Sequence, residues 1–241
     1  MRLIGSCLQA AERVGNGTLL LPERHPVPDQ FPPDPPEHCD LCPRLYQFRR
    51  DTAVEHPDWY NGAVGSFGDD QARLLIIGLA PGLRGANRTG RPFTGDYAGD
   101  LLYETLGDFG FAKGTYKQDP NDGLKLVDCM ITNAVRCVPP QNKPTGAEIN
   151  TCRDFLTARI DALPNLKAIV VLGRIAHETL LRTFGIKLKE HPFAHQARHD
   201  LSNGLAMFDS YHCSRYNTNT GRLTPEMFQA VFSDVRSFFD A

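Results

Sequence analysis

Four short apolar runs divide the chain, and segments with helical spacing lie between them. The runs are Leu74–Leu79, Leu126–Val135, Ala168–Leu172 and Leu205–Tyr211. A run without alternating polar positions is typical of a strand that is covered on both faces of its sheet. Apolar positions recur at helical spacing in Leu101–Leu106, Gly146–Ala162, Arg174–Phe184 and Thr224–Phe239. Alternating strands and helices predict an α/β fold, with a parallel sheet covered by helices on both faces.

Local signals mark several element boundaries. Thr145 is a suitable N-cap for the helix that follows it, and Gly185 favours a stop after the next helix. Cys39–Arg50 is typical of a turn that leads into a short helix, and Glu55–Asp70 of an irregular loop.

The N-terminal 38 residues differ from the rest of the chain. They are weakly patterned, and Pro22–Pro36 is dense in proline. Proline fixes its own backbone angle and lacks an amide donor, so this stretch favours an extended surface segment. We therefore expect one domain over residues 1–241, with residues 1–38 as a proline-rich extension.

Composition and charge narrow the classes of protein. The 241 residues include 26 basic and 28 acidic side chains, for a formal net charge of −2. No apolar run approaches the roughly 20 residues that a membrane span needs, and the N-terminus lacks the pattern of a secretory signal. We expect a cytoplasmic protein with no membrane partner. A nucleic-acid binder with this balance needs a local basic face.

Basic residues do gather in three segments. Arg84, Arg88 and Arg91 follow the first strand, and Arg215 and Arg222 flank a late loop. The intermediate segment is the densest, and its members are Arg182, Lys187, Lys189, His191, His195, Arg198 and His199. Scattered arginines usually lie on a solvated surface, so these groups permit nucleic-acid binding without establishing it.

A glycine-rich loop follows the first strand. The stretch Arg73–Gly99 reads RLLIIGLAPGLRGANRTGRPFTGDYAG. Ligands in open α/β sheets bind beyond the carboxyl ends of the strands, and glycine lets the backbone approach them closely. The loop matches neither of the nucleotide-binding fingerprints, GxGxxG and GxxxxGK[ST]. On its own it indicates only some ligand, for example a phosphate.

The chain has seven cysteines, and four of them have the spacing of metal ligands. Cys39 and Cys42 form a C-x-x-C, Cys137 follows the second predicted strand, and Cys152 lies early in the next helix. An odd count argues against a disulfide framework, and Cys129 is expected to be a buried apolar residue. Four thiolates suit zinc or an iron–sulfur cluster. The long separation between Cys137 and Cys152 favours the cluster modestly and leaves zinc open.

Three stretches together resemble the uracil-DNA glycosylase superfamily, and within it family 5, the type B enzymes that carry an iron–sulfur cluster. They are Gly78–Gly99, Ile131–Cys152 (ITNAVRCVPPQNKPTGAEINTC) and Ser210–Phe228 (SYHCSRYNTNTGRLTPEMF). The resemblance extends from about residue 36 to the C-terminus. It implies a three-layer α/β/α sandwich around a four-stranded parallel sheet. It also implies a [4Fe-4S] cluster held by Cys39, Cys42, Cys137 and Cys152, all within residues 39–152.

The resemblance further implies a base-binding pocket. Phe93 matches the aromatic residue that stacks on the base, and the amide of Asn133 both donates and accepts, as the edge of uracil requires. The backbone around them would line the pocket through Gly78, Leu79, Ala80 and Gly82. The alternatives are that Phe93 is an ordinary core residue and that Asn133 caps a loop.

Two further residues match the chemistry of base release. His212 matches the catalytic histidine, which would bond the uracil oxygen where charge develops. Many relatives carry Asp, Asn or Glu where this chain has Leu79, which cannot activate water. Asp96 would then activate the water or stabilise the cationic sugar, unless its carboxylate only bonds loop amides.

The remaining matched positions concern DNA. Ser214–Gly221 would enter the duplex, with Arg215 or Tyr216 filling the gap that a flipped base leaves. Relatives often have proline where Cys213 stands here, so the identity of the wedge stays open. The other expected DNA contacts are Arg88, Arg91, His195 and Ser214.

The expected function is that of a monomeric, monofunctional DNA glycosylase that acts on double-stranded and, as a further option, single-stranded DNA. It would flip and excise uracil, together with other deaminated bases such as hypoxanthine or xanthine, and so initiate base excision repair. No lysine matches a catalytic position, so no strand-nicking step is expected. One alternative is a non-catalytic iron–sulfur DNA-binding module of the same fold. Another is a zinc-stabilised hydrolase of free nucleotides.

Overall fold

The computed structural model describes residues 31–241, which form one compact unit around a central sheet. This sheet has six strands in the order β1-β5-β2-β6-β8-β7. The strands are β1 (Phe67–Gly68), β2 (Leu74–Gly78), β5 (Cys129–Asn133), β6 (Ala168–Leu172), β7 (Arg198–Asp200) and β8 (Ala206–Ser210). The strands β5, β2, β6 and β8 pair in parallel, whereas β1 and β7 run antiparallel at the edges. The expectation of an α/β fold is confirmed.

The expected sheet of four parallel strands is extended by one antiparallel strand at each edge, so the central sheet has six strands. The four predicted apolar runs became β2, β5, β6 and β8, and all residues of these strands are buried. Both edge strands are short and partly exposed, so the sequence has no apolar run there that would predict a strand. A separate two-stranded ribbon, β3 (Ala112–Lys113) with β4 (Lys125–Leu126), was also unforeseen.

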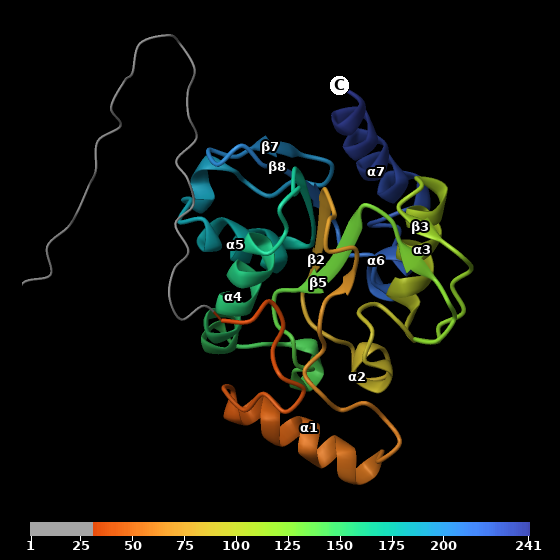
Figure 1. The fold of residues 1–241 in the computed structure, drawn as a ribbon, viewed down its shortest axis with the longest axis vertical. Coiled ribbons are helices and arrows are strands. Elements are labelled where there is room, and N and C mark those ends of the chain that lie inside the picture. Colours follow the sequence, from red (N-terminus) through yellow and green to blue (C-terminus); the bar gives the residue numbers. More distant parts are fainter. Residues whose placement is uncertain (1–30) are drawn as a thin grey trace, which may run out of the picture. The chain divides into compact units, whose positions relative to one another are not determined.

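Helices cover both faces of the sheet (Figure 1). Their bounds are α1 (Pro43–Glu55), α2 (Ala86–Thr89), α3 (Tyr97–Asp108), α4 (Gly146–Asp161), α5 (Arg174–Thr183), α6 (Arg215–Asn219) and α7 (Pro225–Asp240), with short 3₁₀ turns η1 (Pro140–Asn142) and η2 (Leu188–Glu190). Helices α3 and α7 pack on one face, around a core that includes Leu102 and Phe232. Helices α4 and α5 cover the other face through residues such as Leu156 and Leu180.

The predicted helix signals agree with the structure. Thr145 caps α4, and Thr145 and Glu148 form a reciprocal capping box. Gly185 follows α5 in the left-handed backbone region, at φ 68°. Cys152 lies inside α4, as expected.

A partly buried ion network connects the segment just before α1 to the core. Asp34 accepts hydrogen bonds from Arg136, which is 1 % exposed, and from Ser66, and it pairs with Arg159. Burial raises the pKa of Asp34, but Arg136, Ser66 and Arg159 outweigh it and leave that pKa lowered. Residues 31–38 therefore belong to the packed domain. The part of the proline-rich prediction that falls on residues 1–30 lies outside the described residues.

In the described part of the chain, no helix combines the length and the apolar character that a bilayer crossing requires.

Candidate active site

A cavity of about 620 Å³ opens where β2 and β5 end and the segment after β8 begins. The side chains of Phe93, Asp96, Asn133 and His212 all line it. They come from four separate stretches of sequence, and the sheet brings these stretches together because its parallel strands end at the same edge. Leu79, Ala80 and Gly82 line the same cavity. The four side chains expected to do the chemistry therefore share one site.

Gly78 makes this site possible although it does not line the cavity. A Cβ atom on Gly78 would lie 2.4 Å from Asn133 Oδ1 and 2.5 Å from Phe93 Cζ. Both distances are well below van der Waals contact. Only glycine at the end of β2 lets the Phe93 ring and the Asn133 amide lie against the strand.

Phe93 is held in an unusual backbone conformation. Its φ is 53°, in the left-handed region that bulky residues rarely adopt, and its side chain is 7 % exposed. The Tyr116 hydroxyl donates to the Phe93 carbonyl at 3.1 Å. A Cβ on Gly99 would collide with the same carbonyl, so this glycine is also required. Such strain, held by its surroundings, is typical of ligand-binding positions.

Asn133 ends β5, with only 3 % of its surface exposed. Its Oδ1 atom is buried and has no hydrogen-bond partner. An unpaired buried acceptor is costly unless a ligand completes it. The amide is therefore ready to bind a ligand with a complementary donor.

Asp96 has two roles in the geometry. It is the N-cap of α3, because its Oδ1 accepts from the backbone N–H of Ala98 at 3.2 Å. Its Oδ2 lies against the glycine loop, since a Cβ on Gly85 or on Gly82 would collide with it. Burial raises the pKa of Asp96, and its bonds to the backbone of α3 oppose that rise. Asp96 Oδ1 therefore bonds a backbone amide, as the structural alternative for this residue expected. That role does not occupy Oδ2, which stays available for the proposed chemistry.

His212 follows β8 and stacks beside Phe93. The ring centroids are 5.9 Å apart, with 27° between the ring planes. Its Nδ1 is buried without a partner. Burial lowers the pKa of His212 to about 4, because the protein around it disfavours the charged ring. His212 is therefore a neutral imidazole at physiological pH.

The segment after His212 forms a short helix where a loop was expected. Ser214 caps α6, and its hydroxyl accepts from the backbone N–H of Asn217. Ser214 and Arg215 line the cavity, and the Arg215 guanidinium lies over the Tyr97 ring at 5.3 Å. Tyr216, the residue after Arg215, is 72 % exposed. Cys213, in contrast, is fully buried and donates to the Ala98 carbonyl.

The other expected DNA contacts lie in different environments. Arg88 is exposed and donates to the Gly95 carbonyl, beside the cavity. Arg91 corrects its prediction: it is 5 % exposed and forms a two-bond ion pair with Asp122 at 2.8 and 2.9 Å. Aromatic rings enclose it, so its guanidinium is unavailable to a phosphate. His195 stacks on Tyr211 and accepts from that residue's backbone N–H, which makes it part of the support for the end of β8.

Three polar side chains that line the cavity were not predicted from the sequence as parts of the site. They are Arg84, Tyr97 and Asn142. Arg84 lies in the glycine-rich loop and was noted only as one of several basic residues. Asn142 has a φ of 56°, and its backbone conformation gave no sequence signal besides its place in a polar loop.

The four predicted ligand cysteines also meet, in a small apolar pocket under α1. Cys39, Cys42, Cys137 and Cys152 line it, and none of them forms a disulfide. Burial and the neighbouring thiols raise the pKa of Cys152 to about 11 and that of Cys137 to about 12. The backbone N–H of Arg136 donates to Cys152 Sγ at 3.2 Å. Four sulfurs around one pocket, two of them on buried residues and one accepting from an amide, fit a metal–sulfur group, which would supply the positive charge that thiolates need.

Comparison with known proteins agrees with this geometry. The family model of the uracil DNA glycosylase superfamily matches residues 66–236. The chain therefore belongs to the uracil-DNA glycosylase superfamily.

Individual relatives narrow the placement. A type-5 uracil-DNA glycosylase of Thermus thermophilus is 44 % identical over 82 % of this chain and 92 % of the relative. One of Mycobacterium leprae is 41 % identical over 82 % and 90 %. One of Pyrobaculum aerophilum is 35 % identical over 80 % and 86 %. Within the superfamily the chain groups with the type-5 enzymes.

Proposed function

We propose that the protein is a monofunctional DNA glycosylase that flips uracil out of DNA and hydrolyses its N-glycosidic bond, the first step of base excision repair. The observation that carries this proposal is the single cavity shared by Phe93, Asp96, Asn133 and His212. The family to which the chain belongs, and the names of its relatives, support the same activity.

Base recognition follows from Phe93 and Asn133. A flipped base needs an aromatic surface to replace its lost stacking, and the Phe93 ring provides one. The unpaired Oδ1 of Asn133 accepts from the N3–H of uracil, and its amide nitrogen donates to the neighbouring carbonyl. Cytosine, which lacks a donor at N3, cannot make this pair of bonds.

His212 stabilises the base as it leaves. Breaking the bond places negative charge on the uracil oxygens, and a neutral imidazole can donate a hydrogen bond to one of them. Because the ring already lies in the wall of the cavity, stacked beside Phe93, its donor is in position before this charge appears. The stabilisation is larger in the transition state than in the substrate, which is the condition for catalysis.

Asp96 acts on the sugar side. Its carboxylate projects from the N-terminus of α3 toward the glycine loop. Among the described residues that line the cavity, Asp96 is the one with an acidic side chain. The sugar becomes cationic as the base leaves, so a nearby carboxylate stabilises it and orients or deprotonates the attacking water. The raised pKa of Asp96 brings it closer to that of an effective base.

The rim of the cavity binds the DNA. Arg84, Arg88 and Arg215 surround the opening or lie beside it, and they can contact phosphates. Tyr216 is the proposed wedge, because it is exposed on α6 and directly follows Arg215, which lines the cavity. None of the described residues that line the cavity is a lysine, which supports hydrolysis without a strand-nicking step. A single chain supplies all these groups, so we propose a monomer.

A [4Fe-4S] cluster held by Cys39, Cys42, Cys137 and Cys152 is part of the proposal. The chemistry that such a group supplies here is structural. Its ligands come from the segment before α1, the loop after β5 and the start of α4, so it would join these three segments.

The proposed substrate range extends to hypoxanthine and xanthine. A volume of about 620 Å³ exceeds what a pyrimidine alone fills, and both purines carry the carbonyl next to an N–H that Asn133 recognises in uracil.

The test is a panel of duplexes that each contain one uracil, hypoxanthine or xanthine, with alkali added afterwards to reveal abasic sites. We expect release of uracil, and loss of about 10²–10³-fold in rate in His212→Ala with DNA binding retained. A protein that binds the uracil duplex without releasing the base would instead be a binding module. Release of uracil from free dUMP but not from DNA would indicate a nucleotide hydrolase.

A further inference from the structure

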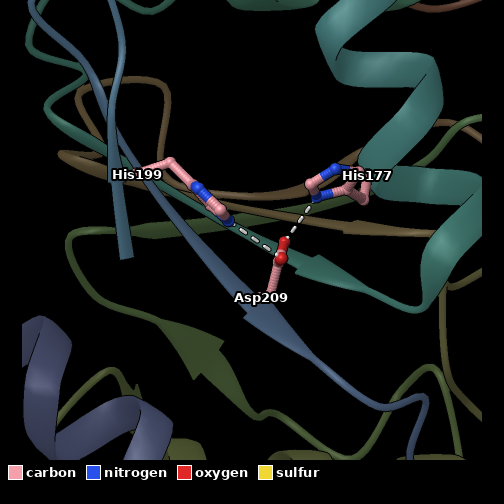
Figure 2. Close-up of side chains that lie close together, drawn as sticks. All are labelled: His177, His199 and Asp209. Carbon is pink, nitrogen blue, oxygen red and sulfur yellow. Dashed lines mark hydrogen bonds and ion pairs between the residues drawn. The ribbon is translucent and has the colours of Figure 1, made fainter. Parts of the chain in front are cut away.

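A second group of ligand-type side chains lies where α5 meets β7 and β8. His177 comes from α5, His199 from β7 and Asp209 from β8, and the three converge as Figure 2 shows. His177 is 1 % exposed and Asp209 0 %, and the side chain of His199 is 9 % exposed. None of the three lines the base-binding cavity. The sequence had placed His199 in a basic surface segment, and the structure turns it toward a buried carboxylate instead.

Both ring nitrogens of His177 face oxygen atoms that accept hydrogen bonds, but a neutral imidazole carries only one N–H. Its Nε2 lies 2.9 Å from the backbone carbonyl of His191, and a carbonyl oxygen only accepts. Nε2 therefore carries the hydrogen of a neutral ring, which leaves a lone pair on Nδ1. That lone pair faces Asp209 Oδ1 at 2.7 Å, and a carboxylate also only accepts. Two acceptor atoms this close need a hydrogen or a cation between them, and a metal ion meets that requirement.

The surroundings match those of a metal ligand. The carbonyl of His191 holds the far nitrogen of His177, as backbone carbonyls commonly do for metal-bound histidines. His199 presents Nε2 to Asp209 Oδ2 at 3.0 Å, and the three ligand atoms all lie within 4.8 Å of one another. The backbone N–H of Ala194 donates to Asp209 Oδ2 and fixes the carboxylate.

We propose that His177 Nδ1, His199 Nε2 and the Asp209 carboxylate bind a divalent transition-metal ion, and that zinc is the ion that fits. Two imidazoles and one carboxylate are a common zinc donor set, and a small shift of these side chains brings all three atoms to the roughly 2.0–2.2 Å that zinc requires. Water would complete a tetrahedron.

The site would act on the fold, not on the substrate. It joins helix α5 to the β7–β8 hairpin, and Asp209 lies on the strand that leads into His212. Its ligands are distinct from the four cysteines. Because imidazoles and a carboxylate bind zinc well, zinc can be used to load this site whatever metal the cysteine pocket holds.

The experiment compares the holoprotein with His199→Asn after incubation with zinc and removal of the excess by gel filtration. His199 is the variant of choice because β7 is a short edge strand, which should tolerate the change. His56→Asn is the matched control, since His56 stacks on Trp59 and is not one of the three proposed ligands. We expect the wild type and the control to retain about one more zinc per chain than His199→Asn. We also expect zinc to raise their unfolding temperature and to leave that of His199→Asn unchanged.

The cysteine pocket is identical in all these proteins. Any zinc bound there therefore contributes equally to the zinc content of the wild type and of each variant. Asp209→Asn, which keeps the side-chain shape and removes the charged ligand, gives a second variant with the same expected loss. Equal zinc content in the wild type and the variants, with no zinc-dependent change in unfolding temperature, would overturn the metal site. The contact between His177 Nδ1 and Asp209 Oδ1 would then be an ordinary hydrogen bond.

Discussion

His212 carries a pH dependence that a solvated histidine would lack. The unfolded chain binds a proton at this residue with a pKa near 6.5, whereas burial lowers the folded pKa to about 4. Between these values the unfolded state binds more protons. His212 therefore contributes stability that is fully present above about pH 6.5 and is lost as the pH falls toward 4.

This effect predicts a difference between the wild type and His212→Asn. From pH 7 to pH 5 the free energy of unfolding should fall more steeply in the wild type, by up to about 1.4 kcal/mol per pH unit at the lower end. Denaturant unfolding at a series of pH values measures it. Parallel curves for the two proteins would mean that the ring is solvated in the folded state.

Gly78 offers a second prediction about a single residue. Gly78→Ala adds a methyl group that collides with Asn133 Oδ1 and Phe93 Cζ. We expect a loss of about 1–3 kcal/mol in the free energy of unfolding, together with weaker uracil excision, because both base-binding side chains must move. Gly107→Ala is the control, since its Cβ meets nothing within 4 Å and its place in α3 favours alanine by about 0.5–1 kcal/mol. Equal activity in the two variants would contradict the close packing at the end of β2.

At the scale of the element, helix α3 begins at the residue proposed to handle water. Asp96 both caps this helix and lines the cavity, so removing it confounds two effects. Asp96→Asn separates them, because asparagine is an equally good N-cap but cannot accept a proton. We expect Asp96→Asn to keep the wild-type stability and to slow base release by about 10²-fold or more.

Asp96→Ala completes that comparison. It should lose a similar amount of activity and about 1 kcal/mol of stability besides, through the missing cap. Single-turnover excision and thermal unfolding of both variants provide the measurements. If Asp96→Asn retained full activity, the residue would be only a helix cap and the water would be held by another group.

The sequence predicts the buried strands of the sheet but not the strands at its edges. The strands β2, β5, β6 and β8 are buried on both faces, and burial leaves an apolar run that a sequence shows directly. The edge strands β1 and β7 are held by backbone pairing to a neighbour, and side chains do not record that pairing. Helix α6 is short and depends on the Ser214 cap, so it lacks a periodic pattern.

The candidate site was predictable where motif and geometry coincide, and the exceptions have physical causes. Phe93, Asp96, Asn133 and His212 lie in long matched motifs and meet in one cavity. Arg91 lies close to Arg88 in sequence, yet Asp122 and three aromatic rings bury it. The partner that decides its environment is distant in sequence, so charge alone misassigned it.

At the scale of the whole molecule, the cysteine pocket joins segments that are far apart in sequence. Cys42 is the N-cap of α1, Cys137 follows β5, and Cys152 lies in α4. In addition, Arg49 of α1 donates to the backbone carbonyls of Glu37 and Cys39. The Asp34 ion pairs hold the segment before the sheet to it, and the proposed cluster would add a second connection.

Loss of one ligand should therefore loosen this assembly. Protein purified without oxygen should contain roughly four irons per chain and absorb near 400 nm, and Cys42→Ser should lose both signals. Because the remaining buried thiols have raised pKa values, they stay protonated and cannot hold the segments together. We expect Cys42→Ser to unfold at a lower temperature and to be cleaved faster by protease near α1. Cys129→Ala is the control: Cys129 is buried in the core beside the sheet, so its loss should leave the iron content unchanged. A colourless wild type whose bound zinc falls by about one ion per chain in Cys42→Ser but not in Cys129→Ala would instead mean that the four sulfurs bind a single zinc ion.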